Sequence, residues 1–254
     1  MRIAFVFAVA LAVAATAAAF GPASDFANAA VYQDGWYDGE DGGTGFDYPW
    51  TFSPTLAPFT VESSTQNGDG DSNSDGDIDT VGKSFTIRTN GNAIYAALRF
   101  LTPGPLQIGD RVAYDFDAVG FGIDGFANCD LTSQSAVRFD LRVTGGEVNY
   151  VILDAAGSND SGVPVTDEGI HVALDLTGAD TYTLRVTPLG GATTERSGTL
   201  AGAGDIAIFR CGIANDASGL NVAYFNSVVV PEPGAAAAAL AAALALTIAK
   251  RRRA

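Results

Sequence analysis

Residues 137–143 read VRFDLRV, an uninterrupted alternation of apolar and charged side chains. Successive side chains of an extended chain point to opposite faces, so this stretch predicts a β-strand with one dry and one wet face. The dry face would carry Val137, Phe139, Leu141 and Val143, and the wet face Arg138, Asp140 and Arg142. The strand must therefore bury one side against another layer.

The same pattern extends over most of the chain. Alternation recurs at 111–117 and 182–187, and apolar runs at 94–101, 148–153, 206–209 and 220–230 predict more central strands. Gly, Asp, Asn and Pro clusters separate them, and Gly145 with Gly146 predicts a hairpin turn. No stretch of residues 30–230 shows a sustained helical period. We therefore predict an all-β fold, an antiparallel two-sheet sandwich of about ten to twelve strands.

The strand order and the closing stretch LNVAYFNSVVV, residues 220–230, resemble the concanavalin A-like jelly rolls of lectin and laminin-G modules. This resemblance rests on pattern and implies a jelly-roll sandwich. An immunoglobulin-like sandwich is the alternative, although about 200 residues exceed one such unit.

The N-terminal end is typical of a secretory signal peptide. Met1 and Arg2 precede an uncharged apolar run from Ile3 to Phe20. Small residues offer cleavage after Ala19 or after Ala29, and we prefer the later site, which makes residues 1–29 the signal peptide and 30–230 the extracellular domain. An uncleaved N-terminal anchor is the alternative.

The last residues, 231–254, combine three features in a fixed order. A proline motif comes first, then an uncharged Ala/Leu run at 234–249, then a basic cluster at 250–253. A helix over that run would be about 24 Å long, a marginal span of a hydrocarbon core of about 30 Å. The residues are Pro231, Glu232 and Pro233 for the motif and Lys250, Arg251, Arg252 and Arg253 for the cluster.

This order resembles the PEP-CTERM sorting signal of Gram-negative bacteria. The resemblance implies recognition of Pro231, Glu232 and Pro233 by an exosortase-type processing enzyme. It also implies a short C-terminal transmembrane helix that is held transiently in the inner membrane, followed by release to the cell surface or the extracellular polysaccharide matrix. A tail anchor that is never cut is the alternative.

The whole chain of 254 residues contains 29 acidic and 14 basic side chains, a net charge of −15. Such a chain repels nucleic acid, so we expect no nucleic-acid partner. The only two cysteines, Cys129 and Cys211, predict a disulfide in an exported protein, with Cys129 placed in a polar loop. Two buried thiols are the alternative.

The stretch NGDGDSNSDGDIDT, residues 67–80, carries an oxygen-bearing side chain at every second position. Such ligands suit Ca2+, and part of the stretch is similar to the start of an EF-hand loop, although Gly82 stands where that loop has a bidentate Glu. A disordered acidic linker is the alternative. The candidate ligands are Asp71, Asn73, Asp75, Asp77 and Asp79.

Aromatic residues are concentrated in residues 31–59, together with acidic residues. Trp36, Tyr37 and Trp50 form a candidate glycan platform on which sugar rings would stack. Core packing is the alternative that we favour.

No paired-carboxylate strand motif or GxSxG elbow is present, and His171 is the one histidine, in a predicted strand. We therefore expect no enzyme. The favoured function is a non-catalytic, exported structural or adhesive protein of the cell surface or matrix. The alternative is a lectin-like carbohydrate-binding module that depends on calcium.

Overall fold

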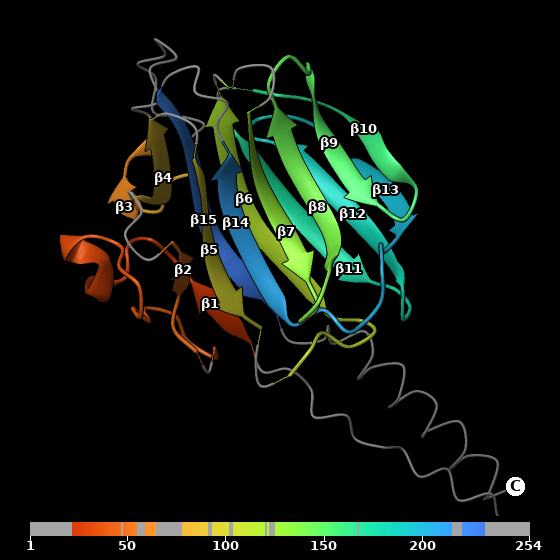
Figure 1. Cartoon of the computed structure of the whole chain (residues 1–254), viewed down its shortest axis with the longest axis horizontal. Helices are drawn as coiled ribbons and strands as arrows, with labels where there is room; N and C mark the ends of the chain where they lie inside the picture. The colour runs from red at the N-terminus through yellow and green to blue at the C-terminus, as the bar shows by residue number, and fades with distance from the viewer. Residues whose placement is uncertain are drawn as a thin grey trace, which may run out of the picture.

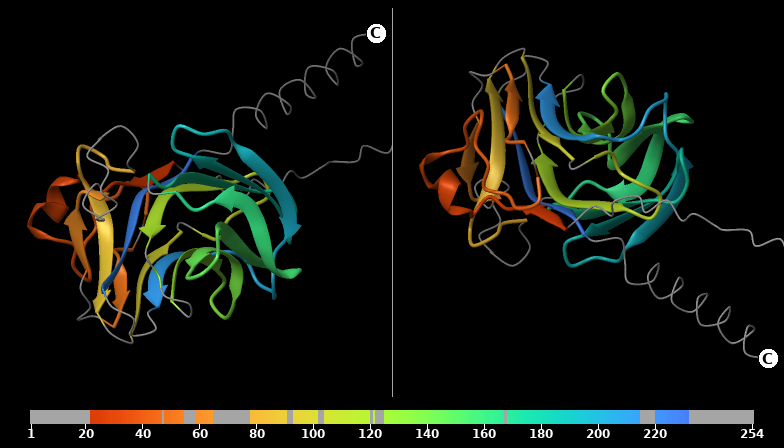
Figure 2. Two further views of the ribbon diagram at one scale, coloured as in Figure 1. Left: turned by 90° about the horizontal axis from the view of Figure 1, so that it is seen from above. Right: turned by 90° about the horizontal axis from the view of Figure 1, so that it is seen from below.

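The computed structural model describes residues 22–46, 48–54, 59–64, 78–90, 93–101, 104–119, 121, 125–166, 168–214 and 220–231. In these residues two antiparallel sheets lie face to face, as Figure 1 shows. The views from above and below in Figure 2 show the same two layers end-on. The predicted all-β, two-sheet antiparallel sandwich is confirmed.

The eight-stranded sheet has a path of seven strands, with β1 paired to one of them. In spatial order they are β13 (Thr194–Thr199), β12 (Thr181–Pro188), β11 (Ile170–Leu176), β6 (Arg111–Val119), β15 (Leu220–Val230), β4 (Ser84–Asn90) and β3 (Phe59–Glu62), and β1 (Ala23–Asp25) pairs with β15.

The seven-stranded sheet faces the viewer in Figure 1. Its spatial order is β10 (Gly157–Pro164), β9 (Asn149–Asp154), β8 (Val137–Thr144), β7 (Phe126–Thr132), β14 (Ile208–Ala214), β5 (Ile94–Phe100) and β2 (Thr51–Ser53). One short 3₁₀ helix, η1 (Ala30–Asp34), precedes β2.

Strand β8 shows how alternation builds the core and where it fails. Phe139 is fully buried and meets the ring of Tyr182, on β12 of the other sheet, edge-on with centroids 5.1 Å apart. The β7–β8 register shifts by one residue between Leu131, which lies opposite Phe139, and Thr132, which lies opposite Val137. Because of this bulge, Val137 is 39% exposed and Arg138 is buried, so the predicted faces of these two residues are wrong.

The predicted disulfide is not formed. Cys129 lies in the central strand β7, not in a loop, and directly opposite Cys211 of β14. Both are buried free thiols. Burial in the core raises the pKa of each thiol, which disfavours the reactive thiolate. The two segments are therefore held together by the strand ladder and by packing.

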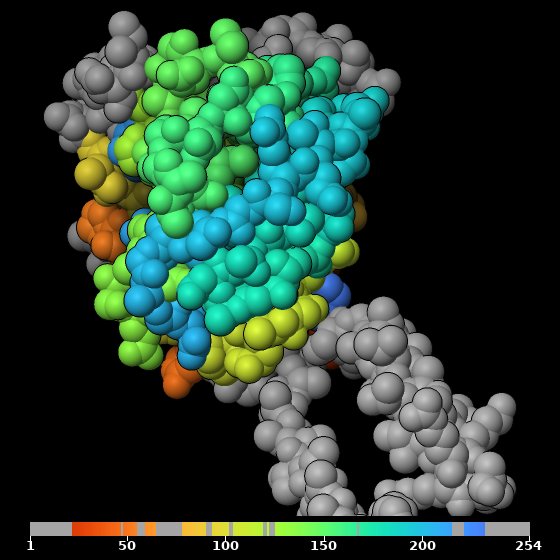
Figure 3. All heavy atoms as spheres, turned by 90° about the vertical axis from the view of Figure 1, so that its right-hand side faces the viewer, coloured from red at the N-terminus to blue at the C-terminus, as the bar shows by residue number. Residues whose placement is uncertain are grey.

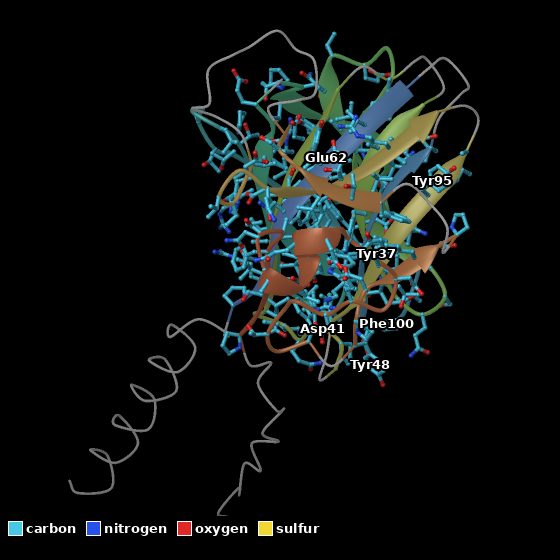
Figure 4. All side chains as sticks on the ribbon, turned by 90° about the vertical axis from the view of Figure 1, so that its left-hand side faces the viewer. Tyr37, Asp41, Tyr48, Glu62, Tyr95 and Phe100 are labelled. Carbon is cyan, nitrogen blue, oxygen red and sulfur yellow. The ribbon has the colours of Figure 1, made fainter. Side chains whose placement is uncertain are left out.

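The N-terminal segment closes one side of the sandwich, the side seen in Figure 4. Trp36 packs edge-on against Trp50 and Phe52, with ring centroids 5.1 and 4.9 Å away. Both tryptophans are 1% exposed. These aromatics therefore belong to the core, which contradicts a glycan platform built on Trp36 and Trp50.

A buried ion pair fixes this segment to the seven-stranded sheet. Asp25 on β1 and Arg99 on β5 have fully buried side chains, with Arg99 Nη2 3.1 Å from Asp25 Oδ2. Tyr32 and Trp50 also donate to Asp25, each at 2.9 Å. The amide of Ala27 donates to the Asn226 side chain at 3.1 Å. Residues 22–29 are thus part of the folded body.

The opposite side of the sandwich is closed by its two edge strands, β10 and β13. Figure 3 shows the green atoms of the β9–β10 region directly against the blue-green atoms of the β12–β13 region. Arg196 Nε donates to the Ser161 carbonyl at 3.2 Å, and the Ala155 amide donates to the Thr199 carbonyl at 2.9 Å. The β10 edge thus has a carbonyl bound by a side chain of β13, and the β13 edge has a carbonyl bound by the β9–β10 turn.

We predict that the mature chain begins upstream of Ala23, because strand pairing starts there. Of the two cleavage alternatives, the cut after Ala19 preserves β1, whereas the cut after Ala29 removes it. A chain that starts at Ala30 lacks strand β1 and leaves the buried Arg99 guanidinium with Asp41, whose side chain is 40% exposed, as its remaining carboxylate partner. It should lose about 3 to 5 kcal/mol of unfolding free energy against one that starts at Phe20, through the lost buried partner and the lost β1–β15 pairing.

Urea unfolding of the two chains measures this difference. N-terminal sequencing of the exported protein checks the cut itself. A mature protein that begins at Ala30 and unfolds with undiminished stability would contradict the prediction.

Candidate functional site

A hollow of about 470 Å³ lies on the outer face of the seven-stranded sheet, over β5, β14, β7, β8 and β9. Its walls are largely apolar and its floor is polar. The apolar walls include Ile94, Phe126, Val137 and Leu153, and the polar floor includes Asn128, Asp140, Arg142 and Arg210, with Gly212 between them. We call this hollow the groove.

Strand register sets the order of the floor residues. Arg210 on β14 lies opposite Asp130 on β7, which lies opposite Asp140 on β8. In the next row, Gly212 lies opposite Asn128, which lies opposite Arg142. All these residues alternate with core residues, so the same pairing that packs the core brings them together.

The floor residues form one continuous hydrogen-bond network. Arg210 Nε donates to Asp130 Oδ2 at 2.7 Å, and Arg142 Nε donates to Asp140 Oδ2 at 3.1 Å. Asn128 Nδ2 donates to both carboxylates, at 3.0 Å to Asp130 Oδ2 and 3.2 Å to Asp140 Oδ1. Two arginines therefore flank two carboxylates that are joined by one amide.

Asp130 is the most buried charge of this network. Its side chain is fully buried and its Oδ1 atom has no hydrogen-bond partner among the described residues. Burial raises the pKa of Asp130 to about 6, against the hydrogen bond from Arg210, and nearby Asp140 raises it further. The other carboxylate, Asp140, lines the groove with a side chain that is 3% exposed.

Aromatic rings stand at both ends of the outer face. The Arg142 guanidinium lies over the Phe126 ring, 4.5 Å from its centroid. At the other end of β5, Tyr48 lies beside Phe100 with ring centroids 5.5 Å apart, and Figure 4 shows this pair at the lower rim of the molecule. Tyr48 is 55% exposed, a larger exposed fraction than that of Phe126 at the first end.

A second hollow, of about 530 Å³, lies between the edge strands β10 and β13. Its polar groups bind one another. Tyr182 donates to Asp154 Oδ2 at 2.7 Å, and the amide of Ala156 donates to Asp154 Oδ1 at 2.8 Å. Asp154, which lines both hollows, is therefore bound at both of its oxygens.

Of the predicted glycan platform, only Tyr37 is exposed. Its hydroxyl donates to the carbonyl of Asp34 at 2.6 Å, and Figure 4 shows it on the side formed by the N-terminal segment. Trp36 and Trp50 lie beneath this surface. The three residues therefore do not form one binding face.

Of the predicted calcium ligands, only Asp79 lies within the described residues. Its Oδ1 accepts from the Ser64 amide at 2.9 Å and its Oδ2 accepts from the Ser63 hydroxyl at 2.6 Å. Asp71, Asn73, Asp75 and Asp77 lie outside the described residues. Within the described ranges, no three His, Cys, Asp or Glu side chains gather in a way that could hold a metal ion.

The sorting tail also lies largely outside the description, which ends at Pro231. Glu232, Pro233, the run at 234–249 and the basic cluster at 250–253 are not included. Among the residues that the structure describes, we find no helix with the length and apolarity needed to cross a bilayer.

His171 lies on the eight-stranded sheet, away from the groove. Its Nδ1 atom is 2.7 Å from Asp115 Oδ1 on the neighbouring strand. The hydrogen bond to Asp115 raises the His171 pKa, against a lowering by burial. The expected structural role agrees with this pairing.

The groove was not predicted from the sequence, although a pattern that indicates its central strand is present. The run ANCDLT, residues 127–132, alternates as strictly as 137–143, but its outward residues are polar and small. Because Asn and Asp favour turns, the residues NCD predict a loop, which the structure contradicts. Strict period two in such a run, next to another alternating run, could have identified β7.

Comparison with known proteins gives no family assignment. No protein-family model matches the chain, and no curated protein matches it in sequence. Among solved structures, the chain is similar to a sialidase (16% identity, TM-score 0.49), with 72% of this chain covered and 17% of the sialidase chain. The chain thus spans about a sixth of that protein.

Two further solved structures are similar. One is the carbohydrate esterase of the Shiga toxin-encoding bacteriophage phi24B, at 14% identity and TM-score 0.45, with 72% of this chain and 90% of that chain covered. The other is the exoplasmic/lumenal domain of VIP36 in its Ca2+/Man3GlcNAc-bound form, at 10% identity and TM-score 0.40, with 58% and 78% covered. At such identities the likeness concerns the fold alone.

The expectation that the chain is not an enzyme is corrected by these findings. A sialidase and a carbohydrate esterase are among the structures that it is similar to. The lack of a recognisable catalytic motif in the sequence therefore does not exclude catalysis.

The raised pKa of Asp130 predicts a pH dependence of stability. Its folded pKa of about 6 lies above the ordinary value of 3.8, so the stabilisation is complete below about pH 4 and is lost as the pH rises through 6. The substitution Asp130→Asn removes this contribution. Between pH 4 and pH 7 the wild type should lose up to about 3 kcal/mol of unfolding free energy that the variant does not lose. The difference in unfolding free energy, variant minus wild type, should therefore rise by that amount.

Denaturant unfolding at both pH values measures the difference. Asp175→Asn on the other sheet is the matched control, because burial raises the pKa of Asp175 but hydrogen bonds from Arg111 and Arg185 lower it overall. Its profile should follow that of the wild type between pH 4 and pH 7, because a carboxyl pKa that is lowered on folding changes the unfolding free energy mainly below about pH 4. Equal pH profiles for the wild type and Asp130→Asn would refute the prediction.

Proposed function

We propose that this chain is an exported surface or matrix protein whose β-sandwich binds carbohydrate in the groove. One observation carries the proposal: a network of charged and amide groups forms the floor of a solvent-open hollow with apolar walls. Sugars combine apolar C–H faces with hydroxyl edges, and sites of this composition suit both. Arg142 and Arg210 supply donors, and the side-chain amide of Asn128 supplies its oxygen as an acceptor.

The arginines have hydrogen-bonding capacity left for a ligand. Each binds its aspartate through Nε and Nη2, so Nη1 is not part of these bonds. The Arg142 side chain is 22% exposed and that of Arg210 is 35% exposed. The floor is close to neutral because each arginine is matched by an aspartate, which favours a neutral ligand over a polyanion.

The sorting tail supports export to the surface or matrix. Strand β15 ends at Val230, immediately before Pro231 of the proline motif. Cleavage at the motif by an exosortase-type enzyme would therefore leave the paired part of the sandwich intact. We keep the transient membrane helix at 234–249 as part of this proposal.

The proposed surface protein has a jelly-roll fold and a Ca2+ site in the Asp-rich stretch 67–80. We propose a jelly-roll arrangement of the concanavalin A-like kind, in which two sheets of seven or more strands enclose one core. Ca2+ at the Asp-rich stretch would be held by Asp71, Asn73, Asp75 and Asp77, since hard oxygen ligands at this spacing suit it. Asp79 would then serve mainly to join Ser63 and Ser64 to the end of this stretch.

Glycan binding is tested by calorimetric titration with mannotriose, maltotriose, cellotriose and trigalacturonate, with and without Ca2+. We expect at least one neutral trisaccharide to bind. Arg142→Gln should weaken its binding about tenfold, the equivalent of about 1.4 kcal/mol for a lost charged hydrogen bond.

Arg111→Gln is the matched control, because Arg111 is a half-exposed arginine bound to Asp175 on the outer face of the other sheet. It should leave the affinity unchanged. Absence of binding by every sugar, or equal losses in both variants, would reject the groove as the glycan site.

Processing of the tail is tested by the intact mass of the protein from the envelope and from the extracellular fraction of its native host. We expect an extracellular species that ends near Pro233. A full-length C-terminus found only in the membrane would make the tail a permanent anchor.

A further inference from the structure

Asn128 is held in one orientation by groups that can only accept hydrogen bonds. Both N–H groups of its side-chain amide are used, one toward Asp130 and one toward Asp140. If the amide were turned over, its oxygen would face two carboxylate oxygens, which is repulsive. The side-chain oxygen of Asn128 must therefore point away from the aspartates.

That oxygen faces the open space over Gly212. A Cβ atom placed on Gly212 would lie 3.2 Å from Asn128 Oδ1 and 3.0 Å from the carbonyl oxygen of Tyr95. The backbone of Gly212 is not in the left-handed region, so its glycine is not required by conformation. What the missing side chain provides is room in the groove above an acceptor.

The groove therefore has a defined pattern of hydrogen-bonding groups. An acceptor, Asn128 Oδ1, stands in the hollow, and the donors Arg142 and Arg210 stand on the neighbouring strands. A sugar hydroxyl can donate to the first and accept from the others. A uronate carboxylate cannot donate a hydrogen bond to Asn128 Oδ1.

On the basis of the proposed glycan function, we infer that Asn128 is the specificity-determining residue of the groove and that it selects a neutral sugar through one donated hydroxyl. Gly212 provides the space for that hydroxyl. Asp130 and Asp140 are positioning residues, which act by fixing the Asn128 amide.

The inference is tested on the ligand side with mono-O-methyl ethers of the best-binding neutral trisaccharide. Methylation removes a donated hydrogen bond but keeps the oxygen as an acceptor. We expect one ether to bind the wild type at least tenfold more weakly than the parent sugar. Asn128→Ala should bind that ether and the parent equally.

Gly212→Ala is the second variant, because its Cβ would crowd Asn128 Oδ1 while the extended backbone accepts it. It should lower affinity at least tenfold. Because the added Cβ also comes within 3.0 Å of the Tyr95 carbonyl oxygen on the paired strand β5, urea unfolding of the variant accompanies the titration to show that it is folded. Gly104→Ala is the matched control, since a Cβ there meets no atom within 4 Å, and it should bind like the wild type.

The outcomes separate the two proposals. A wild type that binds no sugar overturns glycan binding itself, and the inference with it. A wild type that binds but accepts every methyl ether overturns only the role of Asn128, as does a Gly212→Ala variant of unchanged affinity. Discrimination that is present in the wild type and absent in Asn128→Ala supports the inference.

Discussion

The pairing of β14 with β7 is the interaction on which both the core and the groove depend. It places Cys211 beside Cys129 on the inner face, Arg210 beside Asp130 and Gly212 beside Asn128 on the outer face. A slip of one residue would turn all of these side chains to the wrong face of the sheet. The Arg210–Asp130 ion pair, with its carboxylate fully buried, opposes such a slip because it would be broken. Core packing on the inner face thus fixes the strand register, and that register places the groove residues on the outer face.

Much of the fold follows from side-chain period, but the site does not. Alternation at 137–143 and 182–187 identifies β8 and β12 because one face of each is dry. Strands β10 and β13 cannot be predicted in this way. They are edge strands, and sequences such as GSNDSGVP carry polar residues on both faces. The groove requires knowledge of which strands are neighbours. Arg210 and Asp130 meet only because β14 inserts between β7 and β5, a non-local choice that no local pattern encodes.

A second ion pair with a fully buried carboxylate, Asp25 with Arg99, also joins two segments, at the other side of the sheet. It joins β1 to β5, and the rings of Phe46 and Trp50 lie 4.6 and 5.5 Å from the Arg99 guanidinium. Burial raises the Asp25 pKa to about 6, against the attraction of Arg99, as it does for Asp130. Burying charge is costly, so such pairs favour one arrangement of segments more than they add stability. This explains why residues that read as the end of a signal peptide are integral to the body.

The pairing of β1 with the last residues of β15 brings the two ends of the folded body together. Ala23 lies directly opposite Val230, and Figure 1 places β1 at the lower end of the sandwich. Because both chain ends leave from the same end of the sandwich, an attachment to a surface or to another chain at either terminus holds the domain by that end. Strands β14 and β7 then run away from the attached end, so neither chain end emerges at the opposite end of the sandwich. Linking the two ends by a short loop and opening the chain elsewhere would leave every strand pair in place.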